Sequence, residues 1–142
     1  ENAMSGDYKK NPYNFKHFDN NLAYIKVNGQ NIPADPYTPN FDKKLYQREY
    51  RALLDNSGIS HNDAGINLNP NAFANGSYIL KFDLSPDKCN VWHKHKKRTG
   101  SIDLILGFAK PLPNSINIII MKEFDATLTI DKNKTVVVDY AK

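Results

Sequence analysis

A cysteine and two histidines stand within seven residues, and both residue types bind zinc. His93 and His95 lie two positions apart, so on a strand both imidazoles would project from one face, with Cys89 nearby. Four cationic residues accompany the pair: Lys94, Lys96, Lys97 and Arg98. Their charge opposes a bound dication, and no fourth ligand stands close in the sequence. We therefore expect no metal and no other cofactor, with Cys89, His93 and His95 as weak candidate ligands.

The same stretch can also be interpreted as a phosphate contact. Clustered lysines and arginines neutralise nucleic-acid phosphates, and an indole can stack on an unpaired base. The candidate nucleic-acid-binding residues are Trp92, Lys94, Lys96, Lys97 and Arg98. No known nucleic-acid motif surrounds them, so a solvated basic loop between strands stands as the alternative.

Residues suited to nucleophilic catalysis are present without a recognisable signature. Ser57, Ser60, His61 and Asp63 are close in sequence, but a catalytic triad is defined by its arrangement in space. The chain has no G-x-S-x-G elbow, no glycine-rich phosphate loop and no H-E-x-x-H motif. We expect no catalytic residues and no enzymatic activity.

The composition favours a folded, sheet-rich chain. Of 142 residues 40% are hydrophobic and 24% charged, and fifteen are Tyr or Phe, which favour strands. The net charge of +4 permits an anionic partner without requiring one. A single cysteine fits a reducing compartment, and the longest apolar run, Ile118 to Met121, is too short for a membrane span. These features predict synthesis in the cytoplasm and no membrane association.

The elements before residue 76 should be a hairpin and one good helix. Residues 23–27 alternate as in a strand, and Asn28-Gly29 predicts a tight turn into residues 30–33. The next stretch is predicted to be a loop that cannot pair as a central strand, because it contains Pro33, Pro36 and Pro39. A long loop is expected over residues 59–76, with a short helical turn at 70–74.

The helix is expected over Asp42 to Asn56. Asp42 could cap its first turn, and Phe41 could pack on Tyr46 as a hydrophobic staple. The helical spacing predicts one buried face, made of Tyr46, Tyr50, Leu53 and Leu54.

The second half of the chain should consist mainly of strands. Apolar alternation and turn signals predict five of them, over residues 78–84, 102–108, 116–124, 126–130 and 135–140. Short strands without a βαβ rhythm favour an all-β sandwich or barrel of antiparallel strands.

Residues 1–19 are expected to form an extended N-terminal arm. Tyr13, Phe15 and Phe18 could anchor this arm on a neighbouring subunit or could pack on the chain's own core. Because Met4 is not the first residue, the start Glu1-Asn2-Ala3-Met4 could be a cloning remnant, or the chain could be a fragment of a longer protein.

Several blocks of sequence together make a recognisable pattern. The first runs from Asn2 to Phe18 and contains Tyr8-Lys9-Lys10-Asn11-Pro12-Tyr13-Asn14-Phe15. Further blocks follow along the chain: Val27-Asn28-Gly29-Gln30 with Ile32-Pro33, Phe73 to Tyr78, Phe82 to Asp87, Phe108-Ala109 with Leu112-Pro113, Glu123-Phe124, Ile130 to Asn133, and Asp139-Tyr140. In type and order these blocks resemble the major capsid proteins of Polinton (Maverick) elements and adintoviruses. They span nearly the whole chain, and only the basic stretch Cys89–Arg98 departs from the family pattern.

The resemblance implies an antiparallel jelly-roll β-sandwich over residues 20–142, with one helix in an inter-strand loop. That domain would be the C-terminal half of a double jelly-roll protein. The expected partners are copies of the same protein, in trimers or larger capsid assemblies, with a nucleic-acid contact as an addition. The expected location is a virion or capsid-like particle made in the host cytoplasm, or alternatively in the nucleus. The competing interpretation is a sandwich-type module that binds nucleic acid or carbohydrate through residues 92–98.

Overall fold

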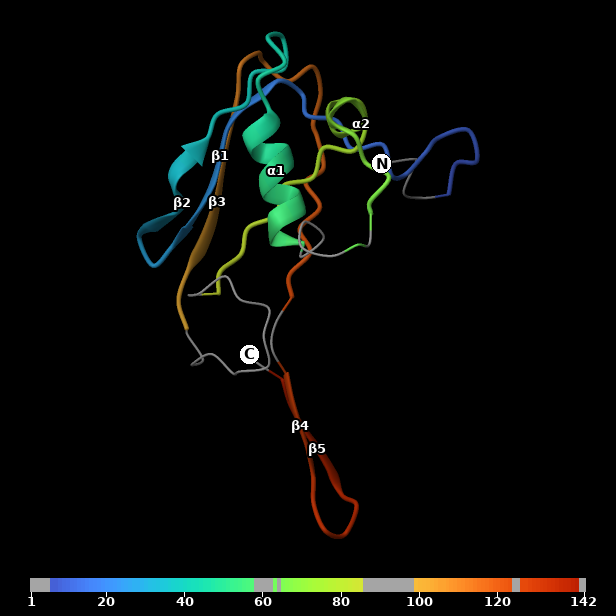
Figure 1. Ribbon diagram of the computed structural model, residues 1–142, viewed down its shortest axis with the longest axis vertical. Helices are drawn as coiled ribbons and strands as arrows, with labels where there is room; N and C mark the ends of the chain where they lie inside the picture. The colour runs from blue at the N-terminus through green and yellow to red at the C-terminus, as the bar shows by residue number, and fades with distance from the viewer. Residues whose placement is uncertain (1–5, 58–62, 64, 86–98, 124–125, 141–142) are drawn as a thin grey trace.

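The computed structural model describes residues 6–57, 63, 65–85, 99–123 and 126–140. These residues form a three-stranded sheet, two helices and a separate two-stranded hairpin (Figure 1). Every strand pair among them is antiparallel. The described chain is therefore strand-rich, as its composition predicts, and antiparallel, as its short strands without a βαβ rhythm predict.

The three-stranded sheet has the order β2-β1-β3, with β1 at Asn20–Val27, β2 at Gln30–Tyr37 and β3 at Ile102–Phe108. β1 and β2 are joined through Asn28 and Gly29, whose φ angles are +49° and +86°. Two consecutive positive φ angles are the geometry of a tight hairpin turn, so this turn was predicted correctly.

The proline-rich loop predicted after the hairpin is wrong in its first part. Residues 33–37 continue β2 instead of leaving the sheet. Pro33 and Pro36 fit there because β2 is the edge of the sheet, where a missing N–H removes no required ladder bond.

The main helix, α1, spans Gln47–Asn56 and not Asp42–Asn56. Before it, Asn40 and Leu45 exchange two backbone hydrogen bonds of 2.8 Å, and Lys44 has a φ of +56°, so the chain makes a tight loop. Asp42 lies in that loop and caps nothing, and Tyr46 takes the N-cap position without a side-chain cap. The rings of Phe41 and Tyr46 do stack, with centroids 5.4 Å apart.

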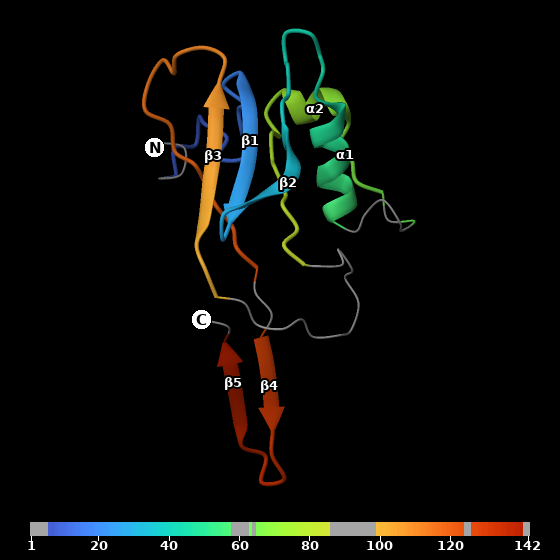
Figure 2. The same ribbon diagram turned by 90° about the vertical axis from the view of Figure 1, so that its left-hand side faces the viewer.

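Helix α1 packs beside the sheet and is tied to β2 by Arg48 (Figures 1 and 2). The Arg48 guanidinium donates to the carbonyl oxygens of Asp35 and Pro36 and lies 2.8 Å from the Asp35 carboxylate. The same group sits over the Tyr37 ring, 5.2 Å from its centroid. Helix and edge strand are thus connected by one side chain.

The core is small and largely aromatic. Its buried hydrophobic members are Ala23, Ile25, Tyr37, Tyr46 and Phe73. Phe73 belongs to the short helix α2, Pro70–Ala74, which the sequence predicted, and Asn69 caps this helix by accepting from the Ala72 N–H. Tyr46 and Tyr50 contact the Phe73 ring, so α1 and α2 meet over one aromatic side chain. Of the predicted buried face of α1, Tyr46 is buried, whereas Tyr50, Leu53 and Leu54 are half-buried.

Two predicted strands are absent from the described ladders. Over residues 78–84 the chain bonds to other partners: the Tyr78 N–H donates to Phe15, and the Asn56 side chain donates to the Lys81 carbonyl. Residues 116–123 belong to no strand of the described chain. Alternation of apolar residues favours an extended chain, but a strand also needs a neighbour with which to pair.

The last two strands form a hairpin that projects from the rest of the molecule (Figures 1 and 2). β4 spans Ala126–Ile130 and β5 spans Val136–Tyr140, close to the predicted bounds. Asp131 fixes the turn because its Oδ1 accepts the N–H groups of Asn133 (2.7 Å) and Thr135 (2.8 Å).

Candidate functional site

The N-terminal arm is attached to its own chain through Phe15. The Phe15 N–H donates to the Gly76 carbonyl at 2.8 Å, and the Tyr78 N–H donates to the Phe15 carbonyl at 3.1 Å. Gly76 has a φ of +110°, and a Cβ there would lie 2.7 Å from the Asn14 side-chain oxygen. A glycine is therefore required where the arm meets the segment after α2.

The three aromatic residues proposed as subunit contacts differ in their surroundings. Phe15 is half-buried, and its backbone is bridged to its own chain. Tyr13 is 75% exposed and Phe18 is 37% exposed. Only Tyr13 among these three leaves most of its surface free for another molecule.

His17 lies at the end of the arm and packs against two aromatic rings. Its ring stacks on Phe41 with centroids 3.6 Å apart and meets Tyr78 edge-on. Its Nδ1 accepts the Asp19 N–H at 2.9 Å, and this hydrogen bond requires a neutral ring with the proton on Nε2. Burial lowers the pKa of His17, and this outweighs the opposite effect of Asp19 and Asp42.

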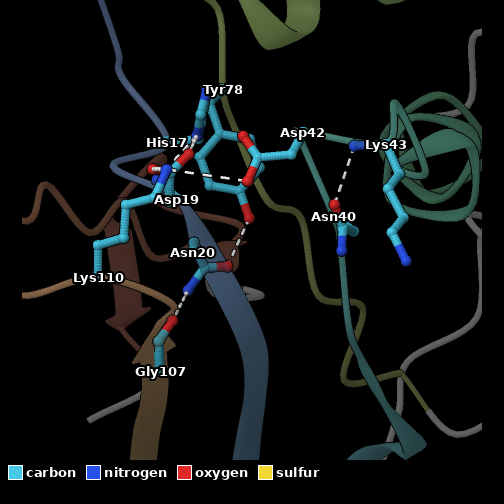
Figure 3. Close-up of polar contacts among 9 residues, drawn as sticks. All are labelled: His17, Asp19, Asn20, Asn40, Asp42, Lys43, Tyr78, Gly107 and Lys110. Atoms are coloured by element: carbon cyan, nitrogen blue, oxygen red, sulfur yellow. Dashed lines mark hydrogen bonds and ion pairs between the residues drawn. The ribbon is translucent and has the colours of Figure 1, made fainter.

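A buried amide connects the arm end with two strands (Figure 3). Asn20 is buried, and its amide nitrogen donates to the carbonyls of Leu22 (2.9 Å) and Gly107 (2.7 Å). Its side-chain oxygen accepts the Tyr78 hydroxyl at 2.7 Å. Burial raises the pKa of Tyr78, so this hydroxyl remains a donor.

An ion pair completes this cluster (Figure 3). The Lys110 ammonium donates to Asp19 at 2.8 Å and lies 3.8 Å from Asp42. The hydrogen bond from Lys110 is the main reason that the pKa of Asp19 lies below its usual value, and the same contact raises the pKa of Lys110. We call His17, Asp19, Asn20, Tyr78 and Lys110 the arm-anchor cluster.

The arm-anchor cluster is built to hold the chain together. Within the described chain no buried side-chain N or O atom lacks a hydrogen-bond partner, so its polar groups are already engaged. A surface hollow of about 440 Å³ beside it is lined by residues 14, 16–19 and 74–76. The described residues contain no group of three or more His, Cys, Asp or Glu side chains that could hold a metal ion.

The β4–β5 hairpin presents an apolar face to solvent. Its register pairs Leu128 with Val138 and Ile130 with Val136, and directly opposed residues share one face of a sheet. All four side chains are exposed. The opposite face carries Thr129 paired with Val137. An isolated two-stranded hairpin is only marginally stable in water, and the apolar face of a sheet needs another element packed against it. No element of the described chain packs against this face.

A second exposed apolar segment precedes the hairpin. Ile118, Ile119, Ile120 and Met121 are consecutive, and each is more than half exposed, with Met121 at 94%. Successive side chains of an extended chain point in opposite directions. Both sides of this segment are therefore open to solvent in the described chain.

The sequence predicted the strands that carry these apolar surfaces, but it did not predict that the surfaces are exposed. Residues 126–130 alternate as strands do, and residues 136–140 are rich in valine; a strand pattern of this kind predicts one covered face. Nothing in the alternation states whether the cover comes from the same chain or from another. The candidate phosphate-contact and metal residues, Trp92, Lys94, Lys96, Lys97 and Arg98 with Cys89, His93 and His95, lie outside the described residues.

Comparison of the chain with protein-family models, with curated proteins and with solved structures finds no match. Of the helices that the structure describes, none has the length and apolar character to cross a membrane.

Proposed function

We propose that this chain is a structural subunit that assembles with copies of itself into a capsid-like particle. The observation that carries the proposal is the apolar face of the projecting hairpin, made of Leu128, Ile130, Val136 and Val138. Contiguous exposed apolar surface of this kind marks interaction sites in soluble proteins. The exposed segment Ile118–Met121 adds a second apolar surface.

The sequence resemblance to Polinton and adintovirus major capsid proteins supports the same function. Under this proposal the described sheet and hairpin are parts of a jelly-roll sandwich over residues 20–142. The apolar hairpin face is then covered by a neighbouring copy or by the remainder of a double jelly-roll polypeptide. Tyr13 and the rest of the exposed arm provide a further contact between subunits in trimers or larger assemblies.

Two lysine substitutions on the hairpin test the proposal. Ile130→Lys places a charge on the apolar face, and Val137→Lys places the same charge on the other face. The two parent side chains are 61% and 59% exposed, so neither substitution disturbs a packed core. Sedimentation velocity over a range of protein concentrations, with electron microscopy of the same samples, measures assembly.

We expect the parent chain and Val137→Lys to form larger species as concentration rises, and Ile130→Lys to remain smaller. Burying an uncompensated ammonium in an apolar contact is strongly unfavourable. A parent chain that stays monomeric at every concentration contradicts the proposal. Equal loss of assembly in both variants shows that the apolar face is not the contact.

A further inference from the structure

We infer that β4 pairs antiparallel with β4 of a second copy about a two-fold axis at Leu128, which joins the two hairpins into one four-stranded sheet, β5-β4-β4-β5. The inference rests on the proposed function, because it names one contact through which the subunits assemble. It concerns the outer edge of β4, the edge that does not face β5.

The sequence of β4 is self-complementary under this symmetry. It reads Ala-Thr-Leu-Thr-Ile, with Leu128 at its centre. Antiparallel pairing about Leu128 sets Leu128 opposite its copy, Thr127 opposite Thr129, and Ala126 opposite Ile130. Aliphatic pairs and threonine pairs are both favourable across strands. A two-fold contact requires such a match, because each copy offers the same surface.

β5 lacks this complementarity. Its sequence is Val-Val-Val-Asp-Tyr, and antiparallel pairing about Val138 would set Val137 opposite Asp139 of the second copy. That arrangement sets an acidic residue opposite an aliphatic one twice, whereas pairing through β4 sets threonine opposite threonine and aliphatic residues opposite each other.

One edge of the three-stranded sheet is protected against strand addition. The edge strand β2 contains Pro33, Asp35 and Pro36, which are residues that prevent further strand addition. β4 contains no proline and no charged residue. The hairpin also projects away from the sheet and helices, where a second chain can reach it (Figures 1 and 2). An open, unprotected edge is a ready template for strand addition.

The charges at the two ends of the hairpin favour antiparallel pairing. The turn holds Asp131, Lys132 and Lys134, with a net charge of +1 from two cations and one anion. Of the described residues toward the opposite end, Lys122, Glu123 and Asp139 carry charge, with a net charge of −1 from one cation and two anions. Antiparallel pairing brings each turn beside the oppositely charged end of the second copy. Parallel pairing would bring like ends together.

The contact is short, and its size determines how it must be measured. Two five-residue strands bury far less than the roughly 800 Å² per partner of a standard interface. A contact of this size is weak alone and contributes when several contacts act together, as in a closed assembly. A covalent trap therefore detects it better than the oligomeric state does.

Cysteine capture in the full chain tests the inference. The parent for this experiment carries Cys89→Ser, which removes the single native thiol. Leu128→Cys places a thiol on the two-fold axis, where opposed Cα atoms lie about 4.5–5.5 Å apart, within disulfide range. Val137→Cys is the matched control, since the exposures of the two parent residues are 58% and 59%. In the four-stranded sheet the two copies of residue 137 stand three strand spacings apart, about 14 Å.

We expect Leu128→Cys to form a disulfide-linked dimer on mild oxidation, in at least about tenfold excess over Val137→Cys, by non-reducing electrophoresis. Equal dimer formation by the two variants, or none by Leu128→Cys, overturns the inference. Sedimentation of the Cys89→Ser parent separates this result from the proposed function. Assembly of the parent without Leu128→Cys dimers leaves the function standing with another contact. Leu128→Cys dimers from a parent that forms nothing larger support the β4 contact and count against a capsid-like assembly.

Discussion

His17 makes the arm anchor sensitive to pH. Its neutral ring accepts the Asp19 N–H and stacks on Phe41, and burial lowers its pKa below the usual 6.5. A folded-state pKa below the unfolded value means that the unfolded chain binds the proton more readily. Stability is therefore fully present above pH 6.5 and is lost as the pH falls through the lower pKa of the folded state.

We expect the free energy of unfolding to fall between pH 7.5 and 5, and to fall less in His17→Phe, which keeps a ring without a titrating group. Urea denaturation at each pH measures both profiles. The other three histidines are present in both proteins, so the difference between the profiles isolates His17. The pKa of Asp19 is lowered too, but it affects stability only in the more acidic range of carboxylates. Parallel profiles would show that His17 does not titrate differently on folding.

Tyr78 supplies the hydroxyl that completes the buried Asn20 amide. Tyr78→Phe removes the 2.7 Å hydrogen bond and leaves the Asn20 side-chain oxygen without that donor in a buried position. We expect the free energy of unfolding to fall by about 1–3 kcal/mol. Tyr13→Phe is the matched control, because the Tyr13 side chain is 75% exposed, and it should change stability by less than about 0.5 kcal/mol. Equal effects of the two substitutions would show that the hydrogen bond between Tyr78 and Asn20 does not stabilise the folded chain.

At the scale of elements, Gly76 decides whether the arm docks. Its φ of +110° is unfavourable for any residue with a Cβ, and the added methyl would meet Asn14 at 2.7 Å. We expect Gly76→Ala to cost about 1–3 kcal/mol and to release the bridge at Phe15. Limited proteolysis should then cut within residues 6–16 faster than in the parent. Gly65→Ala, at a position with no atom within 4 Å and no positive φ, should leave the cleavage rate unchanged.

The sequence predicted elements well where the signal is local. The Asn28-Gly29 turn requires only two residues that accept positive φ, and the short helix at Pro70–Ala74 requires only its proline and its Asn69 cap. The predicted start of α1 was wrong because a backbone bridge between Asn40 and Leu45 competes with the cap that Asp42 could have made. The prediction of a strand at residues 78–84 was wrong because backbone groups of this segment form hydrogen bonds with Phe15 and Asn56, which are distant in sequence.

For the site, the sequence identified candidate residue types but not the contacts that these residues make. The sequence marked the arm aromatics, but the roles of His17, Asn20 and Lys110 depend on contacts across as many as 91 positions. Alternation likewise predicted β4 and β5 without the exposure of their apolar face. A local sequence pattern does not indicate whether the residues that pack on an apolar face belong to the same chain or to another one.

At the scale of the whole molecule, two apolar surfaces of the described chain remain outside its core. The core residues belong to the sheet and the helices, whereas the segment Ile118–Met121 and the hairpin face are exposed. If these surfaces are contacts between subunits, then charging them should change assembly and leave the fold intact. A segment that served only to fold the single chain would give the opposite result.

The double variant Ile119→Lys/Met121→Lys places two charges on one side of the exposed segment, where the parent side chains are 58% and 94% exposed. We expect its free energy of unfolding to stay within about 0.5 kcal/mol of the parent, because exposed positions contribute little to stability. We expect its self-association in sedimentation velocity to fall strongly, since a charged group cannot enter an apolar contact without a partner. Asn114→Lys, at an exposed position before the segment, is the control for an added charge and should assemble as the parent does. A double variant that assembles like the parent would exclude residues 119 and 121 from the contact. A large loss of stability would instead place this segment in the core of the single chain.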